Sequence, residues 1–316
     1  MTSPWTEKSV SLKFSIGEFT LCQLNFRFWV NDTHFTEMTR DMNEFRCSSS
    51  LPPNVEGTLV RSYPIQKRLR RLLVSDGFIR YVPSQYQRYF IKLEGSFSSY
   101  LKKFSSKTRS TLNRKVRKFS EFSGGQIHWQ EYITKEEIEE FYCLARQVSR
   151  TTYQERLLNA GLPESEDFRK LLCEQSERRL IRGYILFHEK KPISYLYCPI
   201  QGEGILIYRY LGYDPDYRNW SPGVVLQFMV LERLFDDDQC LMFDFTEGEG
   251  AHKKFFATEG ILCADIYYFR RTLRNRLILY WHSAFDSTSA AFSRLFDFLG
   301  LKGQLKRLVR SIPSRH

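Results

Sequence analysis

The chain has 316 residues, of which 42% are hydrophobic and 16% aromatic, a composition that excludes an intrinsically disordered protein and allows one large core or two smaller ones. Its formal net charge of +11 favours anionic partners: nucleic acid, phosphorylated substrates or an acidic membrane surface. Seven scattered cysteines with no Cys-x-x-Cys pair speak against a disulfide framework and against a structural zinc site. The start of the chain lacks the layout of a signal peptide, and no apolar run approaches the roughly 18 residues of a membrane span. We therefore expect a cytoplasmic protein that binds no metal.

Residues 1–95 are predicted to be a β-rich region. Apolar and aromatic runs favour strands at 19–30, 78–82 and 86–93, a polar run favours a loop at 40–57, and IQKRLRRLL at 65–73 favours a short basic helix. The region is either a small domain of its own or one half of an internally duplicated fold.

Residues 97–122 predict a basic helical segment, because apolar residues recur there at helical spacing. Eight lysines and arginines and no acidic residue lie between Lys102 and Lys118. Such a run is either a solvated helix face or a surface that binds an anion.

From residue 126 to residue 270, predicted strands and helices alternate. The strands are expected at 126–132, 180–187, 192–200, 204–213, 241–246 and 261–270. One helix follows Thr134, with Glu137 completing a capping box, and others are expected at 164–177, 222–236 and 251–258. Short turns make the middle strands antiparallel. The order predicts an α/β fold with a mixed, largely antiparallel central sheet between helices.

The stretch 204–236 reads as a strand, a polar loop and a helix. Ser221 is expected to be the N-cap of this helix, Pro222 its first residue, and Gly223 follows. A helix start presents free N–H groups that suit a phosphate or pyrophosphate, and Gly223 has no side chain to keep such an anion away. The alternative is an ordinary capped helix.

The tail at 271–316 has leucine, phenylalanine and tryptophan at helix-like intervals, broken by Gly300 and Gly303. From Arg270 onward there are ten basic residues and two acidic ones. A basic amphipathic tail of this kind either packs on its own domain or lies on an anionic membrane surface, which would make the protein peripheral at the inner membrane.

The order of elements resembles the GNAT acyltransferase fold, in which a Gln/Arg-x-x-Gly-x-Gly/Ala pattern at this place cradles the pyrophosphate of coenzyme A. The pattern stands here as Arg218 to Gly223, with Ser221 in place of the first glycine and Pro222 removing one N–H donor. The resemblance implies acyl-coenzyme A as co-substrate, bound by Arg218, Trp220, Ser221 and Gly223.

Three motifs resemble the CelD-type branch of bacterial proteins associated with cellulose and exopolysaccharide biosynthesis. They are Phe97 to Arg109, Gly212 to Gly223 and Phe243 to Phe256, the last with His252 where tyrosine is commoner. The architecture is also similar to that of FemX-type aminoacyltransferases, whose Phe-Lys motif looks like His252-Lys253. These resemblances imply three structural parts: residues 1–95, a GNAT-like domain at 96–270, and the tail.

Candidate catalytic residues follow from the reaction that this resemblance implies, attack of an amine on a thioester. Asp244, inside an apolar strand, or Asp214 would accept the proton of the amine. Asp244 has the alternative of a buried ion pair with Lys253 or Arg209. Tyr208 would protonate the leaving thiolate. His252, Lys253 and Lys254 would bind the acceptor substrate, although the lysines are equally compatible with plain surface residues. Backbone N–H groups near Tyr210 would polarise the carbonyl.

Three functional hypotheses remain open. The first is an acyl-coenzyme A-dependent N-acyltransferase acting on an amino sugar or amine, a small molecule or glycan precursor, in envelope polysaccharide biosynthesis. The second is FemX-like transfer from aminoacyl-tRNA. The third is a non-catalytic GNAT-like scaffold that binds an anionic surface.

Overall fold

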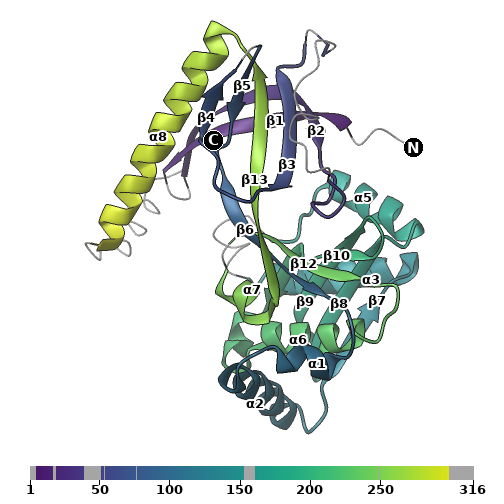
Figure 1. Cartoon of the computed structure of the whole chain (residues 1–316). Coiled ribbons are helices and arrows are strands. Elements are labelled where there is room, and N and C mark those ends of the chain that lie inside the picture. The colour runs from purple at the N-terminus through teal and green to yellow at the C-terminus, as the bar shows by residue number, and fades with distance from the viewer. Residues whose placement is uncertain are drawn as a thin grey trace. The chain divides into compact units, whose positions relative to one another are not determined.

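The computed structural model describes residues 5–16, 19–38, 51–52, 54–75, 77–152, 161–248 and 250–298, and the chain divides into two compact units (Figure 1). Unit 1 comprises residues 1–86 and 262–316, and unit 2 comprises residues 87–261. The changes from one unit to the other fall within strands β6 (Gln85–Lys92) and β13 (Glu259–Arg270), whereas the sequence places boundaries after residues 95 and 270.

Unit 2 has a central, mostly antiparallel sheet with helices on both faces, as the order of elements predicts. In spatial order its strands are β6, β12 (Met242–Glu247), β10 (Ile205–Ile207), β9 (Lys191–Gln201), β8 (Ile181–His188) and β7 (His128–Tyr132), and β11 (Tyr210–Tyr213) pairs with β9 as well. The β10–β12 pair is parallel, and the β6–β12, β9–β10, β8–β9, β7–β8 and β9–β11 pairs are antiparallel.

The helices of unit 2 cover the two faces of this sheet. They are α1 (Phe97–Lys102), α2 (Ser106–Phe122), α3 (Lys135–Ser149), α5 (Glu166–Glu177), α6 (Pro222–Leu234) and α7 (Ala251–Phe256), with a short 3₁₀ helix η2 (Pro215–Trp220). Alternate residues of β8 show which helices lie on which face. Tyr184 and Leu186 are buried in a cluster with residues of α1, α2 and α6, and Ile181 and Ile185 in a cluster with residues of α3 and α5.

Most elements expected in unit 2 are confirmed within a few residues, including the capping box of α3. The Thr134 side chain accepts the N–H of Glu137, and the Glu137 carboxylate accepts the N–H of Thr134 at 2.9 Å. The strand expected at 204–213 is instead two strands, β10 and β11, separated at Tyr208 and Arg209.

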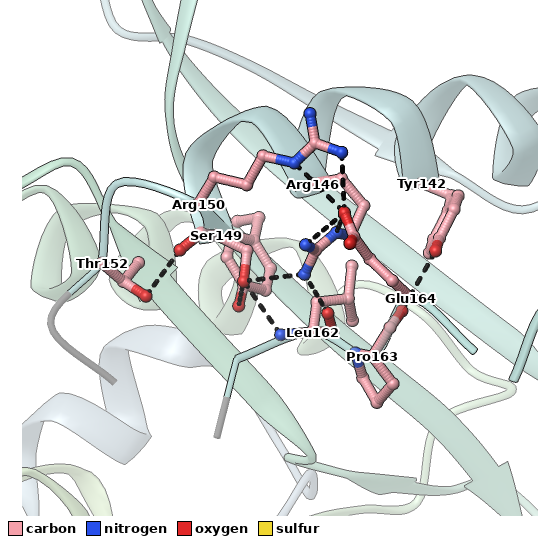
Figure 2. A network of polar contacts seen from close by, with 9 residues as sticks. Tyr142, Arg146, Ser149, Arg150, Thr152, Leu162, Pro163 and Glu164 are labelled. Carbon is pink, nitrogen blue, oxygen red and sulfur yellow. Dashed lines mark hydrogen bonds and ion pairs between the residues drawn. The ribbon is translucent and has the colours of Figure 1, made fainter. Parts of the chain in front are cut away.

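The C-terminal end of α3 is tied to the segment before α5 by a polar network (Figure 2). The Arg146 side chain, which is almost fully buried, donates to the Leu162 carbonyl and from Nε to Oε1 of Glu164 at 3.0 Å. The hydroxyl of Ser149 accepts the N–H of Leu162 at 2.9 Å. This network fixes the position of Thr152, whose methyl group lies 3.0 Å from where a Cβ on Gly212 of β11 would be.

Unit 1 contains a second set of paired strands, with a long helix lying along it (Figure 1). Its strands are β1 (Trp5–Ile16), β2 (Phe19–Asn31), β3 (Gly57–Pro64), β5 (Phe78–Tyr81), β4 (Leu72–Val74) and residues 262–270 of β13, and its helix is α8 (Leu273–Phe298). The order is β1-β2-β3-β13-β5-β4, with β2 and β3 parallel. Leu279 of α8 is fully buried in the same cluster as Phe28 and Phe269 of the sheet.

The prediction of a helix at 65–73 is wrong. Strand β4 begins at Leu72, within the predicted range, and no helix is present between residues 65 and 71. Leu72, Leu73 and Val74 pair with β5, so pairing in the sheet overrides a short helical pattern. The predicted loop at 40–57 falls largely outside the described residues, as does the predicted tail beyond residue 298. Among the described helices, none has the length and apolarity needed to span a membrane.

Candidate functional site

The candidate site lies in unit 2, where the chain leaves the parallel pair of β10 and β12. Ile207 stands opposite Asp244 in this pair, and the N–H of Tyr208 still donates to the Asp244 carbonyl at 2.8 Å. Beyond that bond, β11 pairs with β9 and with no other described strand. The carboxyl ends of β10 and β12 therefore separate at Tyr208.

An extra residue in the chain between β10 and β11 produces one half of this separation. Leu206 stands opposite Ile200 of β9, but Tyr210 stands opposite Tyr197. The four residues 207–210 therefore face only the three residues 197–199 of β9. The N–H of Arg209 also donates to the Tyr197 carbonyl, at 3.1 Å. This arrangement is a β-bulge, a feature that bends a strand away from its neighbour and is common beside active sites.

A second bulge lies in β12 directly after Asp244. Asp244 stands opposite Phe90 of β6, whereas Glu247 stands opposite Arg88, which leaves one extra residue in β12. Thr246 takes a left-handed conformation there with φ of 61°, which a residue with a Cβ rarely adopts. The two bulges lie on adjacent strands, immediately beyond the last bond that holds those strands together.

The separation leaves backbone amides of β11 without a neighbouring strand. In an antiparallel pair, the N–H groups of successive residues point alternately toward and away from the partner strand. Asp214, which follows β11, donates to the Ile193 carbonyl of β9 at 2.8 Å. The amides of Leu211 and Tyr213 therefore point away from β9. The resemblance described above implies backbone amides near Tyr210 that polarise the substrate carbonyl, and these two amides lie close to that position.

Asp244 is fully buried and is paired with Arg88 of β6. The guanidinium donates to Oδ2 from Nε at 2.8 Å and from a second nitrogen, while Oδ1 accepts the N–H of Thr246 at 2.7 Å. Asp244 thus forms a buried ion pair, but the observed donor is Arg88, whereas the sequence suggests Lys253 or Arg209. The carboxylate is held by three donors, which favours a fixed charge over proton exchange.

Tyr208 is partly buried at the point of separation. Its ring packs against Phe245 and Phe243, with centroid distances of 5.6 and 6.2 Å. Burial raises the pKa of its hydroxyl well above the ordinary value, so the group stays protonated at neutral pH. Tyr208 is therefore in the protonation state that a proton donor requires.

Lys253 of α7 lies next to the Arg88–Asp244 pair. Its ammonium group donates to the Glu247 carbonyl and lies 3.4 Å from the hydroxyl of Thr246, both in the β12 bulge. Burial lowers the pKa of Lys253, while the Asp244 carboxylate opposes that shift. The lysine is thus a cation whose charged form is destabilised by its surroundings.

The other two substrate-binding candidates are placed less closely. Lys254 is exposed, with its ammonium group 5.8 Å from the ring centroid of Tyr89. His252 lies in α7, but its side chain is outside the described part of the chain.

The start of α6 differs from the capped helix that the sequence predicts. Ser221 occupies the N-cap position in a left-handed conformation, with φ 54° and ψ 49°, and its side chain makes no capping hydrogen bond. The conformation is one that glycine adopts without strain, which is the residue that the GNAT pattern has at this place.

Gly223 lies directly against β11. A Cβ on Gly223 would be 3.0 Å from Cδ2 of Leu211 and 3.6 Å from Cδ1 of Tyr213. The absence of a side chain therefore lets the helix approach the strand, in addition to the anion access expected from the sequence. Within the described residues no acceptor is found for the N–H of Gly223, as is usual in the first turn of a helix.

The remaining candidates of this loop have distinct surroundings. Arg218 is exposed and forms no ion pair among the described residues, which leaves its guanidinium available to an anion. Trp220 stacks on Phe122 of α2 with centroids 4.0 Å apart. Asp214 is buried, accepts a hydrogen bond from Lys191 at 2.8 Å and caps η2 through the N–H of Asp216. Its contacts are those of a structural carboxylate.

The basic helix α2 packs beside this loop. Besides the Phe122–Trp220 stacking, the ammonium group of Lys118 donates to the Asn219 carbonyl at 3.0 Å. The exposed lysines and arginines of α1, α2 and the turn between them are Lys102, Lys103, Lys107, Arg114, Arg117 and Lys118. If the basic residues between Lys102 and Lys118 bind an anion, that anion would lie next to the start of α6.

Arg88 is a site residue that no motif in the sequence marks. It belongs to QYQRYFIK, where it directly precedes the aromatic and apolar residues 89–91, and an arginine inside a buried strand signals a buried partner of opposite charge. Among the described residues no group of histidine, cysteine, aspartate or glutamate side chains is arranged to hold a metal ion, and the six described cysteines form no disulfide with one another.

Comparison with known proteins agrees with this geometry. Residues 106–254 match the family model of the acetyltransferase (GNAT) domain, and no curated protein sequence matches the chain. The crystal structure of FemX is similar with a TM-score of 0.52 at 9% identity, over 87% of this chain and 90% of that chain.

Two further solved structures are more distant. L-PGS from Bacillus licheniformis has a TM-score of 0.42 at 13% identity, over 71% of each chain. A GCN5-related N-acetyltransferase from Kribbella flavida has a TM-score of 0.32 at 8% identity, over 60% of this chain and 59% of that chain. The family match and the sheet with its separated strands identify the fold of this chain as a mixed α/β, GNAT-like fold.

Proposed function

We propose that the protein is an N-acyltransferase that transfers an acyl group directly from acyl-coenzyme A to an amine. The observation that carries this proposal is the separation of β10 and β12 by two bulges, beside the start of α6, where the N–H of Gly223 has no acceptor among the described residues. An extended thioester fits between separated strands, where it can pair with free backbone amides.

The reaction needs no covalent enzyme intermediate. The lone pair of the acceptor nitrogen attacks the thioester carbonyl, the new C–N bond forms, and the C–S bond breaks with its electron pair leaving on sulfur. The amine loses one proton and the thiolate gains one, so an amide and a thiol are the products. The amides of Leu211 and Tyr213 are assigned to the negative charge that develops on the carbonyl oxygen.

Donor binding is assigned to the loop at the start of α6. The N–H of Gly223 and the positive end of the helix dipole face the diphosphate, and Arg218 supplies a charge-assisted hydrogen bond. Trp220 and Ser221 form the turn: Trp220 through its stacking on Phe122, and Ser221 through its left-handed backbone.

Proton transfer is assigned to Tyr208 and Lys253. Tyr208 keeps its proton at neutral pH and is the proposed donor to the thiolate. Lys253, with its lowered pKa, is the proposed acceptor of the proton from the amine. Asp244, held by Arg88 and the N–H of Thr246, is assigned a positioning role, and Asp214 supports the loop.

The acceptor is proposed to be an amino sugar or amine of envelope polysaccharide biosynthesis, in the cytoplasm. The support is the CelD-type pattern of residues 243–256, together with the cation of Lys254 exposed on α7. Lys254 would bind a phosphate of a glycan precursor.

Calorimetry with acetyl-coenzyme A and longer acyl-coenzyme A species tests donor binding. We expect binding to the full chain, and a loss of at least about tenfold in affinity on Gly223→Glu, which sets a carboxylate against the diphosphate. Gln239→Glu adds the same charge at an exposed position after α6 and serves as the matched control. No binding at millimolar concentration of any of these donors would refute the proposal.

A second candidate, transfer from aminoacyl-tRNA, is favoured by the exposed basic residues of α1 and α2 beside the same loop. Charged tRNA would then bind with a steep dependence on salt, because each phosphate contact releases counterions. Replacing Lys107, Arg114 and Arg117 by glutamine would flatten that dependence. Absence of tRNA binding removes this candidate. A cellular phenotype that stays intact in both Asp244→Asn and Gly223→Glu would favour the non-catalytic scaffold.

A further inference from the structure

Helix α8 has one face buried on the sheet of unit 1. Asn275, Leu279 and His282 are between 0 and 4% exposed and recur at intervals of four and three residues, as residues on one face of a helix do. Nε2 of His282 faces the Lys13 carbonyl at 3.1 Å, and the Asn275 amide donates to Glu56 at 3.1 Å. These contacts fix which side of α8 faces outward.

The outward side carries an apolar stripe, made of Leu273, Leu277, Tyr280 and Trp281. Their exposed fractions are 74, 52, 48 and 72%, and their spacing of four, three and one residues places them on one face. At about 100° per residue this stripe is centred nearly opposite the buried face. Single exposed leucines are ordinary on protein surfaces, but a contiguous stripe of four large side chains marks an interaction site.

The charges around this stripe indicate what it binds. Arg274 and Arg276 lie on its two flanks and are both exposed. Arg274 pairs with Glu56 at 3.0 Å, and the guanidinium of Arg276 lies 5.9 Å from the ring centroid of Tyr280. From Arg270 onward the sequence has ten basic residues against two acidic ones. Leucine, tyrosine and tryptophan in a stripe between arginines are typical of helices that lie in the plane of a membrane surface, with the aromatic rings at the level of the head groups.

We propose that α8 binds the surface of an anionic phospholipid bilayer through Leu273, Leu277, Tyr280 and Trp281. The stripe enters the interface, while Arg276 extends along it to the lipid phosphates. This binding is independent of acyl transfer, because none of these residues belongs to unit 2. It makes the protein a peripheral membrane protein.

Vesicle flotation with the full chain tests the proposal. Binding is expected to vesicles of equal parts phosphatidylcholine and phosphatidylglycerol at about 0.1 M salt, and to be at least about tenfold weaker to vesicles of phosphatidylcholine alone. The double variant Leu277→Glu and Trp281→Glu should lower the partition coefficient to the anionic vesicles at least about tenfold.

A matched control distinguishes an effect of the stripe from a general effect of removing exposed apolar side chains. Leu171→Glu with Leu241→Glu makes the same charge change at two exposed leucines of unit 2, and it should leave binding close to that of the unchanged chain. All four positions are exposed, so circular dichroism should show both double variants folded. Arg276→Gln should weaken binding to anionic vesicles and leave binding to neutral vesicles unchanged.

Three outcomes would overturn the proposal. One is no flotation with anionic vesicles. Another is equal flotation of the unchanged chain and the Leu277→Glu, Trp281→Glu variant. The third is a concentration-dependent dimer in sedimentation velocity that this variant dissociates, since the stripe would then be an interface between two copies of the chain.

Discussion

Arg88 of β6 donates from its Nε to Oδ2 of Asp244 in β12 over 2.8 Å, in a pair that is almost completely buried. The pair joins two neighbouring strands at the point where the β12 bulge begins. It therefore sets the direction in which the end of β12 leaves the sheet. A buried ion pair of this kind is sensitive to the loss of one partner and much less sensitive to the loss of both.

Replacing one partner of this pair should destabilise unit 2 strongly. Arg88→Met leaves a buried carboxylate without its guanidinium, and Asp244→Leu leaves a buried guanidinium, so each should lower the free energy of unfolding by about 3–5 kcal/mol. The double variant should lose less than the sum of the two. Urea unfolding followed by circular dichroism measures the coupling, and additive losses would contradict the pairing described here.

Ser221 should contribute no capping energy, unlike Thr134. Ser221→Ala is expected to leave the free energy of unfolding almost unchanged, because its side chain makes no capping bond. Thr134→Ala should cost about 1 kcal/mol by removing one half of the capping box of α3. Ser221→Val should cost about 1–2 kcal/mol, since a β-branched residue tolerates the left-handed conformation poorly. Thermal unfolding of the three variants provides the comparison.

The pKa of Lys253 should lie below that of an ordinary lysine. Between its lowered pKa and the usual value of 10.5, the folded state has released the proton while the unfolded state still holds it. The free energy of unfolding should therefore rise as pH increases through that window. Lys253→Met should remove this rise, and unfolding of both proteins at several alkaline pH values checks it.

The neighbours of Lys253 should move its pKa in opposite directions. Asp244→Asn removes the carboxylate that raises the pKa, and so should lower the pKa further, whereas Arg88→Met removes a cation and should raise it. Competitive acylation of lysines, read by mass spectrometry as a function of pH, reports the change directly. A shift of the same sign in both variants would contradict the electrostatic account.

Tyr208→Phe should affect the reaction more than the fold. The ring keeps its contacts with Phe243 and Phe245, so stability should change by about 1 kcal/mol or less. The turnover number for acyl transfer should fall about 10²-fold, with the affinity for the donor unchanged. An unchanged turnover number under single-turnover conditions would remove Tyr208 from the mechanism.

Much of unit 2 is predictable from sequence because its signals are local. The Thr134–Glu137 capping box and the end of the strand expected at residue 213, where Asp214 and Pro215 follow, are readable from a few adjacent residues, and each ends or begins an element where expected. The helix predicted at 65–73 fails for the complementary reason: the pairing of Leu72 with Tyr81 in β5 is a contact between residues that a local pattern does not register.

The chemistry of the site depends on contacts of long sequence separation. Asp244 is recognisable as a buried carboxylate from its apolar neighbours, but Arg88 lies 156 residues away. The left-handed turn at Ser221 is likewise hidden, because a serine before a proline looks like an ordinary N-cap. The bulges at Arg209 and Thr246 appear only when two strands are aligned against their partners.

The two inserted residues also determine how tolerant this part of the chain is to change in length. Side chains of a strand alternate between the two faces of the sheet. Deleting Thr246 from β12 would therefore move each later side chain of this strand to the opposite face, and it would let the hydrogen bonding between β12 and β6 continue without a bulge. A single deletion there would close the space between the strands while every proposed catalytic side chain remained in the sequence. In sequences of similar length, the spacing between Asp244 and Glu247 is therefore as informative about activity as the identity of either residue.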